Sequence, residues 1–382
     1  MGVKSVAYLA LSERADEQHA GLTHSRGMCK GLAENGLSVR LFLSAPSFRR
    51  IERDGYSEIR LPRHGFWKPL FGPDARHWRD AQREIENCDI IHERYSINPL
   101  SRWLTRQRRV VLEVNDPLGK TWGFFKSAAF APFFAIQVAA AWRVVTQTRT
   151  LRALLFPEFQ VPIDIVPNGV DLDLFAPDPK KGAKWKSASG FGGKKLVAFV
   201  GSFQHWHGVE LIPAIAESVV RSFPDAVFVL AGMGPLFPRV RAVIASKKLE
   251  KQVVLLGAVS PNQVASLLAA SDVAIAPFDA RSSSALSKNG FWWCPVKLFE
   301  YLAAGVPVVC SDYPETRTIV ASEGVLVPPG NWEIFADAVC RILADPNEAE
   351  QMKERMFKRR SGWSWKERAK ETMGIYNQSS FS

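Results

Sequence analysis

The chain has 382 residues, more than one ordinary hydrophobic core accommodates, so its length predicts two domains. A hydrophobic content of 47% is typical of a globular protein and excludes a disordered or fibrous one. The formal net charge is +11, with over half of the excess in residues 1–110. This excess predicts either a solvated basic surface or an anionic partner. No signature of a nucleic-acid-binding module accompanies the charge, so we expect no nucleic acid and favour an anionic membrane surface.

The five cysteines are widely spread without a CxxC pair, which argues against disulfides or a zinc site and favours a reducing cytoplasm. The N-terminal segment reaches charged residues after a short apolar run, so we expect no signal peptide. The uncharged run Ser127–Trp142 is shorter than the roughly 20 residues of a spanning helix. The phenylalanines around it fit a bilayer interface, an acceptor-binding cleft or core packing. We therefore expect a cytoplasmic protein, with peripheral contact to the inner face of the membrane as one option.

Apolar, β-branched runs alternate with helical patterns along the first half of the chain, as in parallel βαβ units. A helix is expected over about Gly21–Glu34, and Asn35-Gly36 supplies its left-handed stop. Residues 179–194 are rich in Lys, Gly and Ser and predict a loop or linker. The expected strands of this half are Val3–Leu11, Ser38–Ser44, Tyr56–Pro62, Asp89–Glu93, Val110–Val114, Trp142–Thr146 and Asp164–Pro167.

The second half repeats the pattern more clearly. Its expected strands are Leu196–Val200, Ala226–Ala231, Gln252–Leu256, Val273–Pro277, Val306–Ser311 and Gly324–Val327. Its expected helices are Val209–Arg221, Leu236–Ser246, Pro261–Ala270, Val296–Ala304 and Trp332–Ala344. Nearly every strand residue is apolar, as in parallel sheets covered by helices on both faces. We predict an α/β protein of two doubly wound, Rossmann-like domains, 1–168 and 169–355, with an interdomain cleft at the carboxyl ends of the strands. A helical tail, 356–382, is expected to pack back toward the N-terminal domain.

The helix expected after Pro295 places a cation where the helix dipole disfavours it. Lys297 falls in the first turn, at a cost of a few tenths of a kcal/mol or more. A bound anion would reverse this cost, because the free amides and the lysine would converge on it. Glu300 lies three residues further on the same face, and its carboxylate can accept hydrogen bonds from a vicinal diol. The pattern fits a diphosphate beside Lys297 and a ribose beside Glu300, or a plain Lys–Glu surface pair.

Short motifs run in order across nearly the whole chain. They are IHERYS at Ile91–Ser96, VLEVNDPL at Val111–Leu118, IVPNGVDLDLF at Ile165–Phe175, FVGSFQHWHGVELI at Phe199–Ile212, LAGMGP at Leu230–Pro235, VVLLGAV at Val253–Val259, SDVAIAPF at Ser271–Phe278, KLFEYLAAGVPVV at Lys297–Val309 and GVLVPPGN at Gly324–Asn331. In order and spacing the set resembles the retaining GT-B glycosyltransferases called glycosyltransferase group 1, which are family 4-like. The resemblance implies a GT-B fold and a nucleotide-sugar donor.

The resemblance also implies which residues bind the donor. Glu300 matches the second of two glutamates, eight residues apart, and would grip the nucleotide ribose beside Lys297 and Leu298. Gly201 and Ser202 match a Gly-Arg pair, and His207 takes the place of a lysine; the family's two cations bind the diphosphate there. The remaining implied donor-site residues are His205 near the diphosphate, Val259 and Phe278 on the loops that resemble the family's base-binding walls, and Gly21 beneath the phosphates and sugar.

The chain departs from the family at three points. The first glutamate falls at Trp292, so its contact with the donor sugar is missing or supplied elsewhere. The two diphosphate cations are replaced, which leaves Lys297, Arg281, Lys288 and the two histidines of His205-Trp206-His207 as substitutes. The N-domain histidine falls at Asn115. Asp116 beside it could accept the acceptor's proton as a catalytic residue, or could be an ordinary loop residue before Pro117.

Other candidates are more ambiguous. Asp89, Glu93 and Arg94 are expected at a strand end facing the cleft, where they would orient sugar hydroxyls or pair with each other. His24 could approach the phosphates or be an ordinary residue of a capped helix. His205 and His207 lack a nearby third ligand, so we expect no metal site and no cofactor besides the nucleotide-sugar co-substrate.

We therefore predict an enzyme, a glycosyltransferase that moves a hexose from a UDP- or GDP-sugar to a glycan or lipid-linked acceptor with retention. The N-terminal domain would bind the acceptor and the C-terminal domain the donor, in cell-surface polysaccharide or glycolipid biosynthesis. Two alternatives remain, a non-catalytic nucleotide-sugar-binding subunit and a GT-B epimerase or phosphorylase.

Overall fold

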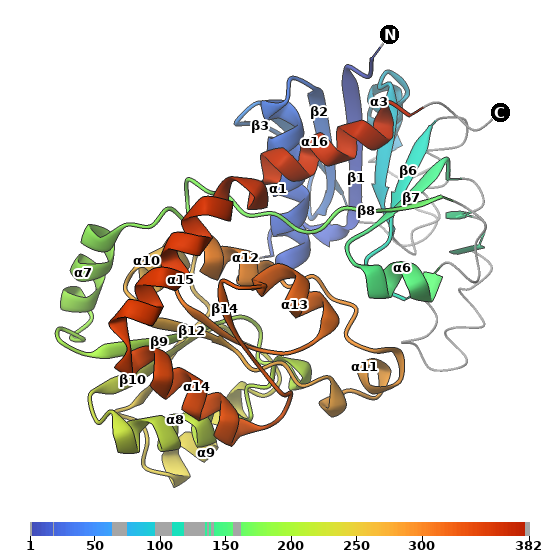
Figure 1. Cartoon of the computed structure of the whole chain (residues 1–382). Helices are drawn as coiled ribbons and strands as arrows, with labels where there is room; N and C mark the ends of the chain where they lie inside the picture. Colours follow the sequence, from blue (N-terminus) through green and yellow to red (C-terminus); the bar gives the residue numbers. More distant parts are fainter. Residues whose placement is uncertain are drawn as a thin grey trace. The chain divides into compact units, whose positions relative to one another are not determined.

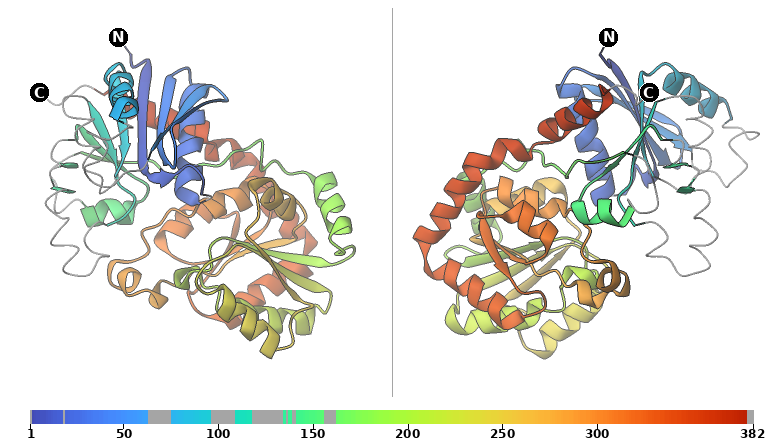
Figure 2. Two further views of the ribbon diagram at one scale, coloured as in Figure 1. Left: turned by 180° about the vertical axis from the view of Figure 1, so that it is seen from behind. Right: turned by 45° about the vertical axis from the view of Figure 1, so that its right-hand side comes forward.

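A computed structural model describes residues 2–17, 19–62, 75–95, 109–117, 134–135, 137–138, 141–155 and 162–378. The chain forms two compact units (Figures 1 and 2). Unit 1 comprises Met1–Gly169, Trp292–Cys294 and Ser364–Ser382, and unit 2 comprises Val170–Phe291 and Pro295–Trp363. The chain therefore returns to unit 1 twice after leaving it, once for three residues and once at its C-terminal end.

Unit 1 is built on a sheet with the strand order β3-β4-β2-β1-β5-β6-β7-β8, as far as the chain is described. All neighbouring strands are parallel except β3 and β4. The strands are β1 (Ser5–Arg14), β2 (Ser38–Ala45), β3 (Arg49–Arg53), β4 (Tyr56–Pro62), β5 (Ile90–Arg94), β6 (Val110–Glu113), β7 (Arg143–Thr146) and β8 (Ile163–Ile165). The described helices are α1 (Ala20–Glu34), α3 (Ala75–Glu86), α6 (Arg149–Leu155) and α16 (Trp365–Tyr376).

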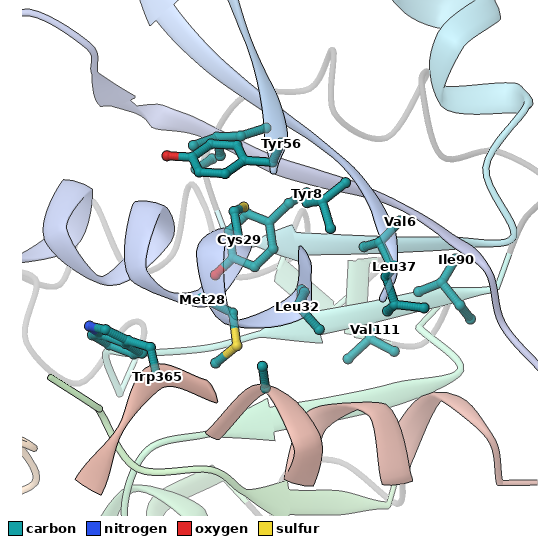
Figure 3. Packing of buried hydrophobic residues seen from close by; sticks show 14 of the residues in the cluster. Val6, Tyr8, Met28, Cys29, Leu32, Leu37, Tyr56, Ile90, Val111 and Trp365 are labelled. Carbon is teal, nitrogen blue, oxygen red and sulfur yellow. The ribbon is translucent and has the colours of Figure 1, made fainter. Parts of the chain in front are cut away.

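Helices α1 and α16 share the main core of unit 1, although they come from opposite ends of the chain. Figure 3 shows Trp365 of α16 and Met28 of α1 within this buried cluster, with Tyr8 of β1 beside them. Two glycines make the close approach possible. A Cβ on Gly31 would lie 2.3 Å from the backbone oxygen of Trp365, and one on Gly27 would lie 2.3 Å from its indole ring. The C-terminal helix is therefore an integral part of unit 1.

Unit 2 contains a wholly parallel sheet in the order β11-β10-β9-β12-β13-β14. Its strands are β9 (Lys195–Val200), β10 (Ala226–Ala231), β11 (Val253–Gly257), β12 (Val273–Ala276), β13 (Val308–Ser311) and β14 (Gly324–Val327). Its α-helices are α7 (Pro179–Ala188), α8 (Ile212–Ser222), α9 (Phe237–Ser246), α10 (Pro261–Ala269), α11 (Ser284–Asn289), α12 (Val296–Ala303), α13 (Pro314–Val320), α14 (Trp332–Ala344) and α15 (Pro346–Arg359). Helices α8 and α14 cover one face of the sheet, and α10 and α12 cover the other (Figures 1 and 2).

The α/β class and the two parallel, Rossmann-like sheets are confirmed, and the predicted strands and helices are present with small shifts at their ends. The loop predicted at residues 179–194 is wrong, because α7 occupies its first ten residues. Asp178 caps this helix by accepting a hydrogen bond from the Lys181 amide at 2.9 Å. Gly182 allows the helix to pack closely, since a Cβ there would lie 2.1 Å from the backbone oxygen of Ala269. Close packing on α10 thus outweighs a composition that is typical of loops.

Strand β3 is an addition to the predicted elements. Its sequence RRIER is almost entirely charged and exposed, so it lacks the apolar pattern of a strand. It forms because it pairs antiparallel with β4 at the edge of the sheet, where charged residues are tolerated. No described helix is long and apolar enough to cross a membrane. The phenylalanine-rich segment around residues 122–133 lies outside the described residues.

Candidate functional site

In unit 2, the predicted donor-site residues gather where β9 and β10 end. Gly201 follows β9 with φ +146° and Gly232 follows β10 with φ +141°, a region that favours glycine. A Cβ on Gly232 would lie 1.9 Å from the backbone oxygen of Gly201, so the two turns pack backbone against backbone. A Cβ on Gly201 would lie 2.3 Å from Nζ of Lys297. The glycines therefore leave room for the lysine at the carboxyl edge of the sheet.

Lys297 stands in the first turn of α12, whose N-cap is Pro295. Its side chain is only 8% exposed, and its Nζ has no hydrogen-bond partner among the described residues. The ammonium lies 4.5 Å from the ring centroid of Phe199 and 5.3 Å from that of Phe278. Burial lowers the pKa of Lys297 to about 7, although the nearby Glu300 carboxyl opposes the shift. The Lys297 ammonium is therefore a buried cation without a hydrogen-bonded anion among the described residues.

Glu300 lies one turn further along α12. Burial of its carboxyl raises the pKa of Glu300 to about 7, and the charge of Lys297 only partly offsets this. The two opposite shifts mean that Lys297 and Glu300 both lose their charges easily near neutral pH. The expected surface Lys–Glu pair is therefore wrong, because Lys297 is buried and both groups are strongly perturbed. Perturbed groups of this kind are typical of functional sites.

His207 is the second candidate for the diphosphate. Its Nδ1 lies 2.6 Å from the backbone oxygen of Ser202, which fixes Nδ1 as the protonated nitrogen and leaves Nε2 as an acceptor in the neutral ring. Burial, followed by the charge of Lys297, lowers the pKa of His207 to about 3. His207 is therefore neutral and does not replace the family's lysine as a cation. His205 points elsewhere, since it is exposed and its Nδ1 lies 3.1 Å from Glu210.

The other predicted contacts in unit 2 have different surroundings. The Phe278 side chain is 1% exposed and its ring lies beside Lys297, so the contact of this loop with a base stays a prediction. The Leu298 side chain is also fully buried, which leaves only its backbone for a ligand. Val259, between β11 and α10, is half-buried and stays a prediction. Arg281 is 64% exposed and holds Asp279 through two hydrogen bonds, whereas Lys288 is exposed on α11.

In unit 1, the residues at the carboxyl ends of β5 and β6 surround a single carboxylate that the sequence reasoning missed. Glu113 is 2% exposed. Its oxygens lie 2.6 Å from the Tyr8 hydroxyl, 2.9 Å from Nε2 of His24 and 3.1 Å from Nε2 of His92. Burial favours the neutral form, but His24 and Arg94 hold the pKa of Glu113 well below its usual range. The available signal was one acidic residue inside the apolar run VVLEV.

This cluster also holds predicted site residues. Asn115 donates its amide to Glu113 at 2.6 Å, and Asp116 follows it directly at the end of β6. His24 is 3% exposed, and its Nδ1 lies 2.6 Å from Oδ1 of Asn168. It is a residue of the capped helix α1, as one of the two alternatives expected, and its approach to the phosphates stays a prediction. The cap is His19, which accepts from the Leu22 amide.

The glycine at the start of α1 is covered by an acidic side chain. A Cβ on Gly21 would lie 2.5 Å from Oε1 of Glu13, and the Gly21 carbonyl accepts from Arg94 at 2.9 Å. Arg94 thus stands at the carboxyl end of β5, as expected. Asp89 does not, because its carboxylate accepts from the backbone amides of Lys4 and Ser5 at the start of β1. Asp89 therefore belongs to the opposite, amino edge of the sheet.

Trp292 is a buried part of unit 1. Its indole is 2% exposed, and its backbone oxygen accepts from the Thr148 hydroxyl at 2.7 Å. Two residues later, the Cys294 carbonyl accepts from Nδ2 of Asn168 at 2.5 Å. The segment Trp292–Cys294 is therefore fixed to the rest of unit 1 through hydrogen bonds to its backbone carbonyls. Among the described residues, no group of three His, Cys, Asp or Glu side chains could hold a metal ion.

Two family models match the chain in succession. "Glycosyltransferase Family 4" matches residues 22–174, and "Glycosyl transferases group 1" matches residues 183–359. A D-inositol 3-phosphate glycosyltransferase of Kineococcus radiotolerans is 26% identical over 90% of this chain and 81% of its own length. An alpha-D-kanosaminyltransferase of Streptomyces kanamyceticus is also 26% identical, over 66% of this chain and 62% of its own length. The Anabaena protein HepE, solved with UDP and glucose, matches the fold with a TM-score of 0.73 at 14% identity, covering 97% of this chain and 100% of that one.

Proposed function

We propose that this chain, which belongs to the group 1 glycosyltransferases of the GT-B fold, transfers a hexose from a UDP- or GDP-sugar to a hydroxyl group with retention. One observation carries the proposal for the donor. The Lys297 ammonium is buried at the start of α12, against the glycine turn after β9, and has no hydrogen-bond partner in the part of the chain that the structure describes. A diphosphate would supply the anion that this lysine lacks.

The diphosphate would sit at the N-terminus of α12. The first amides of a helix have no partner within the helix and attract anions. Gly201 and Gly232 keep side chains away from the approaching oxygens. As the sugar leaves, negative charge grows on the diphosphate, and Lys297 and the helix amides would stabilise it. This proposal needs no metal ion, and activity in the presence of EDTA tests it.

Glu300 would hold the ribose of the same nucleotide. It lies three residues after Lys297, so the two side chains share one face of α12. An ionised carboxylate accepts two hydrogen bonds from a vicinal diol. Ligand binding would therefore favour ionised Glu300 and protonated Lys297 together. At the carboxyl end of β6, Asp116 is the proposed acceptor of the proton that the attacking hydroxyl loses.

The acceptor is proposed to be a glycan or a lipid-linked glycan at an anionic membrane surface on the cytoplasmic side, in polysaccharide or glycolipid biosynthesis. The exposed strand β3 supports the membrane contact through Arg49, Arg50 and Arg53. Reversal of these three charges should weaken sedimentation with vesicles of anionic phospholipid, whereas reversal of Lys353 and Lys358 on α15 should not. Equal sedimentation of both variants with the parent chain would remove the membrane from the proposal.

A non-catalytic nucleotide-sugar-binding subunit is the second candidate. Trp292 favours it, because this tryptophan replaces the first glutamate and is buried in unit 1. The two candidates differ in turnover. A glycosyltransferase should release UDP or GDP from its donor slowly even in water, and Glu300→Ala should abolish the release. A subunit should bind the donor and release nothing.

A thermal-shift screen against UDP-, GDP- and ADP-sugars tests the donor class directly. A bound donor stabilises the folded chain and so raises its melting temperature. At a donor concentration of 100 times Kd, the free energy of unfolding increases by about 2.7 kcal/mol. We expect a shift with one UDP- or GDP-sugar and its loss in Lys297→Met. Lys186→Met is the matched control, because Lys186 is a half-buried lysine of unit 2 that is already paired with Asp272 at 3.0 Å. Absence of a shift with every donor would contradict the proposal.

A further inference from the structure

Glu113 has more donors around it than an ordinary buried carboxylate. Oε2 accepts from the Tyr8 hydroxyl at 2.6 Å and faces Nε2 of His92 at 3.1 Å. Oε1 accepts from Nδ2 of Asn115 at 2.6 Å and lies 2.9 Å from Nε2 of His24. An ionised carboxylate only accepts hydrogen bonds, and these four partners surround it within unit 1. The position and charge of Glu113 are thus fixed from several strands and from α1.

This arrangement fixes the orientation of one amide. Because Glu113 cannot donate, the NH2 end of Asn115 must face it, and Oδ1 must point away. Oδ1 of Asn115 is buried and has no hydrogen-bond partner within the described part of the chain. On the neighbouring strand, Oγ1 of Thr146 is likewise buried and without a described partner. Glu113 pairs in register with Val145, so Thr146, the next residue, points to the other face of the sheet and belongs to different surroundings.

The unfilled oxygen of Asn115 indicates a missing partner. An unsatisfied buried polar group is costly, and native proteins rarely retain one without a reason. Oδ1 of Asn115 therefore offers an acceptor on the face of the sheet that carries Glu113. A hydroxyl group satisfies this oxygen by donating to it. A sugar is the ligand of the proposed function that carries such groups.

We infer that Glu113 is a positioning residue: it locks the Asn115 amide so that Oδ1 accepts a hydrogen bond from a hydroxyl of the bound sugar. The inference rests on the proposed function and adds a residue to it. Tyr8 acts on Asn115 indirectly, because its hydroxyl donates a hydrogen bond to Oε2 of Glu113 and so holds that carboxylate in place. His92 extends the network to the C-terminal helix, where its Nδ1 lies 2.7 Å from the Tyr376 hydroxyl. The Tyr376 hydroxyl of α16 is therefore linked to Asn115 through the side chains of His92 and Glu113.

A double-mutant cycle tests this inference. The measured rate is the release of UDP or GDP from the donor that gives the largest thermal shift. Asn115→Ala should lower kcat/KM about 10- to 100-fold, as expected for a lost hydrogen bond to a ligand. Tyr8→Phe should lower it about 2- to 5-fold in the parent chain and leave it unchanged in the Asn115→Ala background, because its effect passes through Asn115.

Tyr56→Phe is the matched control, since Tyr56 is a buried tyrosine of the same core. It should leave the rate unchanged in both backgrounds. If Tyr8→Phe does not fold, Tyr376→Phe replaces it in the cycle. Equal losses from Tyr8→Phe in both backgrounds, or a full rate in Asn115→Ala, would overturn the inference. Failure of the proposed function looks different, because the parent chain would then bind no nucleotide sugar.

Discussion

Replacement of Lys297 by methionine should make the protein more stable and unable to bind its nucleotide. The lysine is buried, its ammonium has no hydrogen-bond partner in the described part of the chain, and burial lowers its pKa to about 7. Methionine has a similar length and no charge. The substitution therefore removes an unfavourable buried group while it keeps the packing against Phe199 and Gly201.

The size of the effect follows from the pKa shift. Lys297 changes from the reference pKa of 10.5 to about 7, a difference of 3.5, and each unit corresponds to about 1.36 kcal/mol. The full cost is therefore about 5 kcal/mol when the lysine is protonated in both states. Methionine recovers only part of it, and we expect a gain of about 1–3 kcal/mol at pH 7, in the range found for replaced buried charges.

Urea denaturation at pH 7 and pH 10 measures this gain. Between about pH 7 and pH 10.5 the unfolded chain binds the lysine proton and the folded chain does not, so the stability of the parent protein should rise with pH. Lys297→Met should lack that rise and should lose the thermal shift with UDP or GDP. The reasoning is refuted if the variant is less stable than the parent by more than about 1 kcal/mol and still binds the nucleotide.

Three further predictions concern the same units. Nucleotide affinity should fall about tenfold per pH unit above pH 7, because binding needs protonated Lys297; calorimetry of UDP or GDP binding from pH 6 to 9 checks this, and a flat profile would contradict it. Gly201→Ala should abolish nucleotide binding, since its Cβ would lie 2.3 Å from Nζ of Lys297 at φ +146°, whereas Gly192→Ala, in open space, should bind normally; retained binding in Gly201→Ala would be inconsistent with the site. Trp365→Ala should destabilise unit 1 by about 3–5 kcal/mol in urea denaturation, and a loss below about 1 kcal/mol would show that α16 is not part of its core.

The sequence predicted the sheets well because parallel strands are buried on both faces. Runs such as Ala226–Ala231 are wholly apolar, because neither face of the strand is exposed to solvent. Strand β3 and helix α7 escaped prediction for the opposite reason. Both are charged and polar, and they form through their pairing and packing: β3 pairs with the adjacent strand β4 in a hairpin, and α7 packs on the distant backbone of Ala269. Contacts of this kind leave no periodic signal.

The sequence predicted which residues form the candidate site better than it predicted their burial and contacts. Lys297 and Glu300 were located by their spacing and by the family resemblance, but only the structure shows that the lysine is buried and lacks a described partner. For apolar residues, a motif does not distinguish a side chain that lines a pocket from one that supports it. The buried Phe278 ring, beside Lys297, shows why the structure is needed. Glu113 was missed because its partners come from four separate segments of the chain.

Nucleotide release from a sugar donor is the most direct test of the central claim. The purified chain is incubated with UDP- and GDP-hexoses in turn, and free UDP or GDP is measured for the parent chain and for Glu300→Ala. The account predicts release from one class of donor by the parent chain and none by the variant, with both proteins folded. Release by neither protein from any donor, or equal release by both, would contradict it.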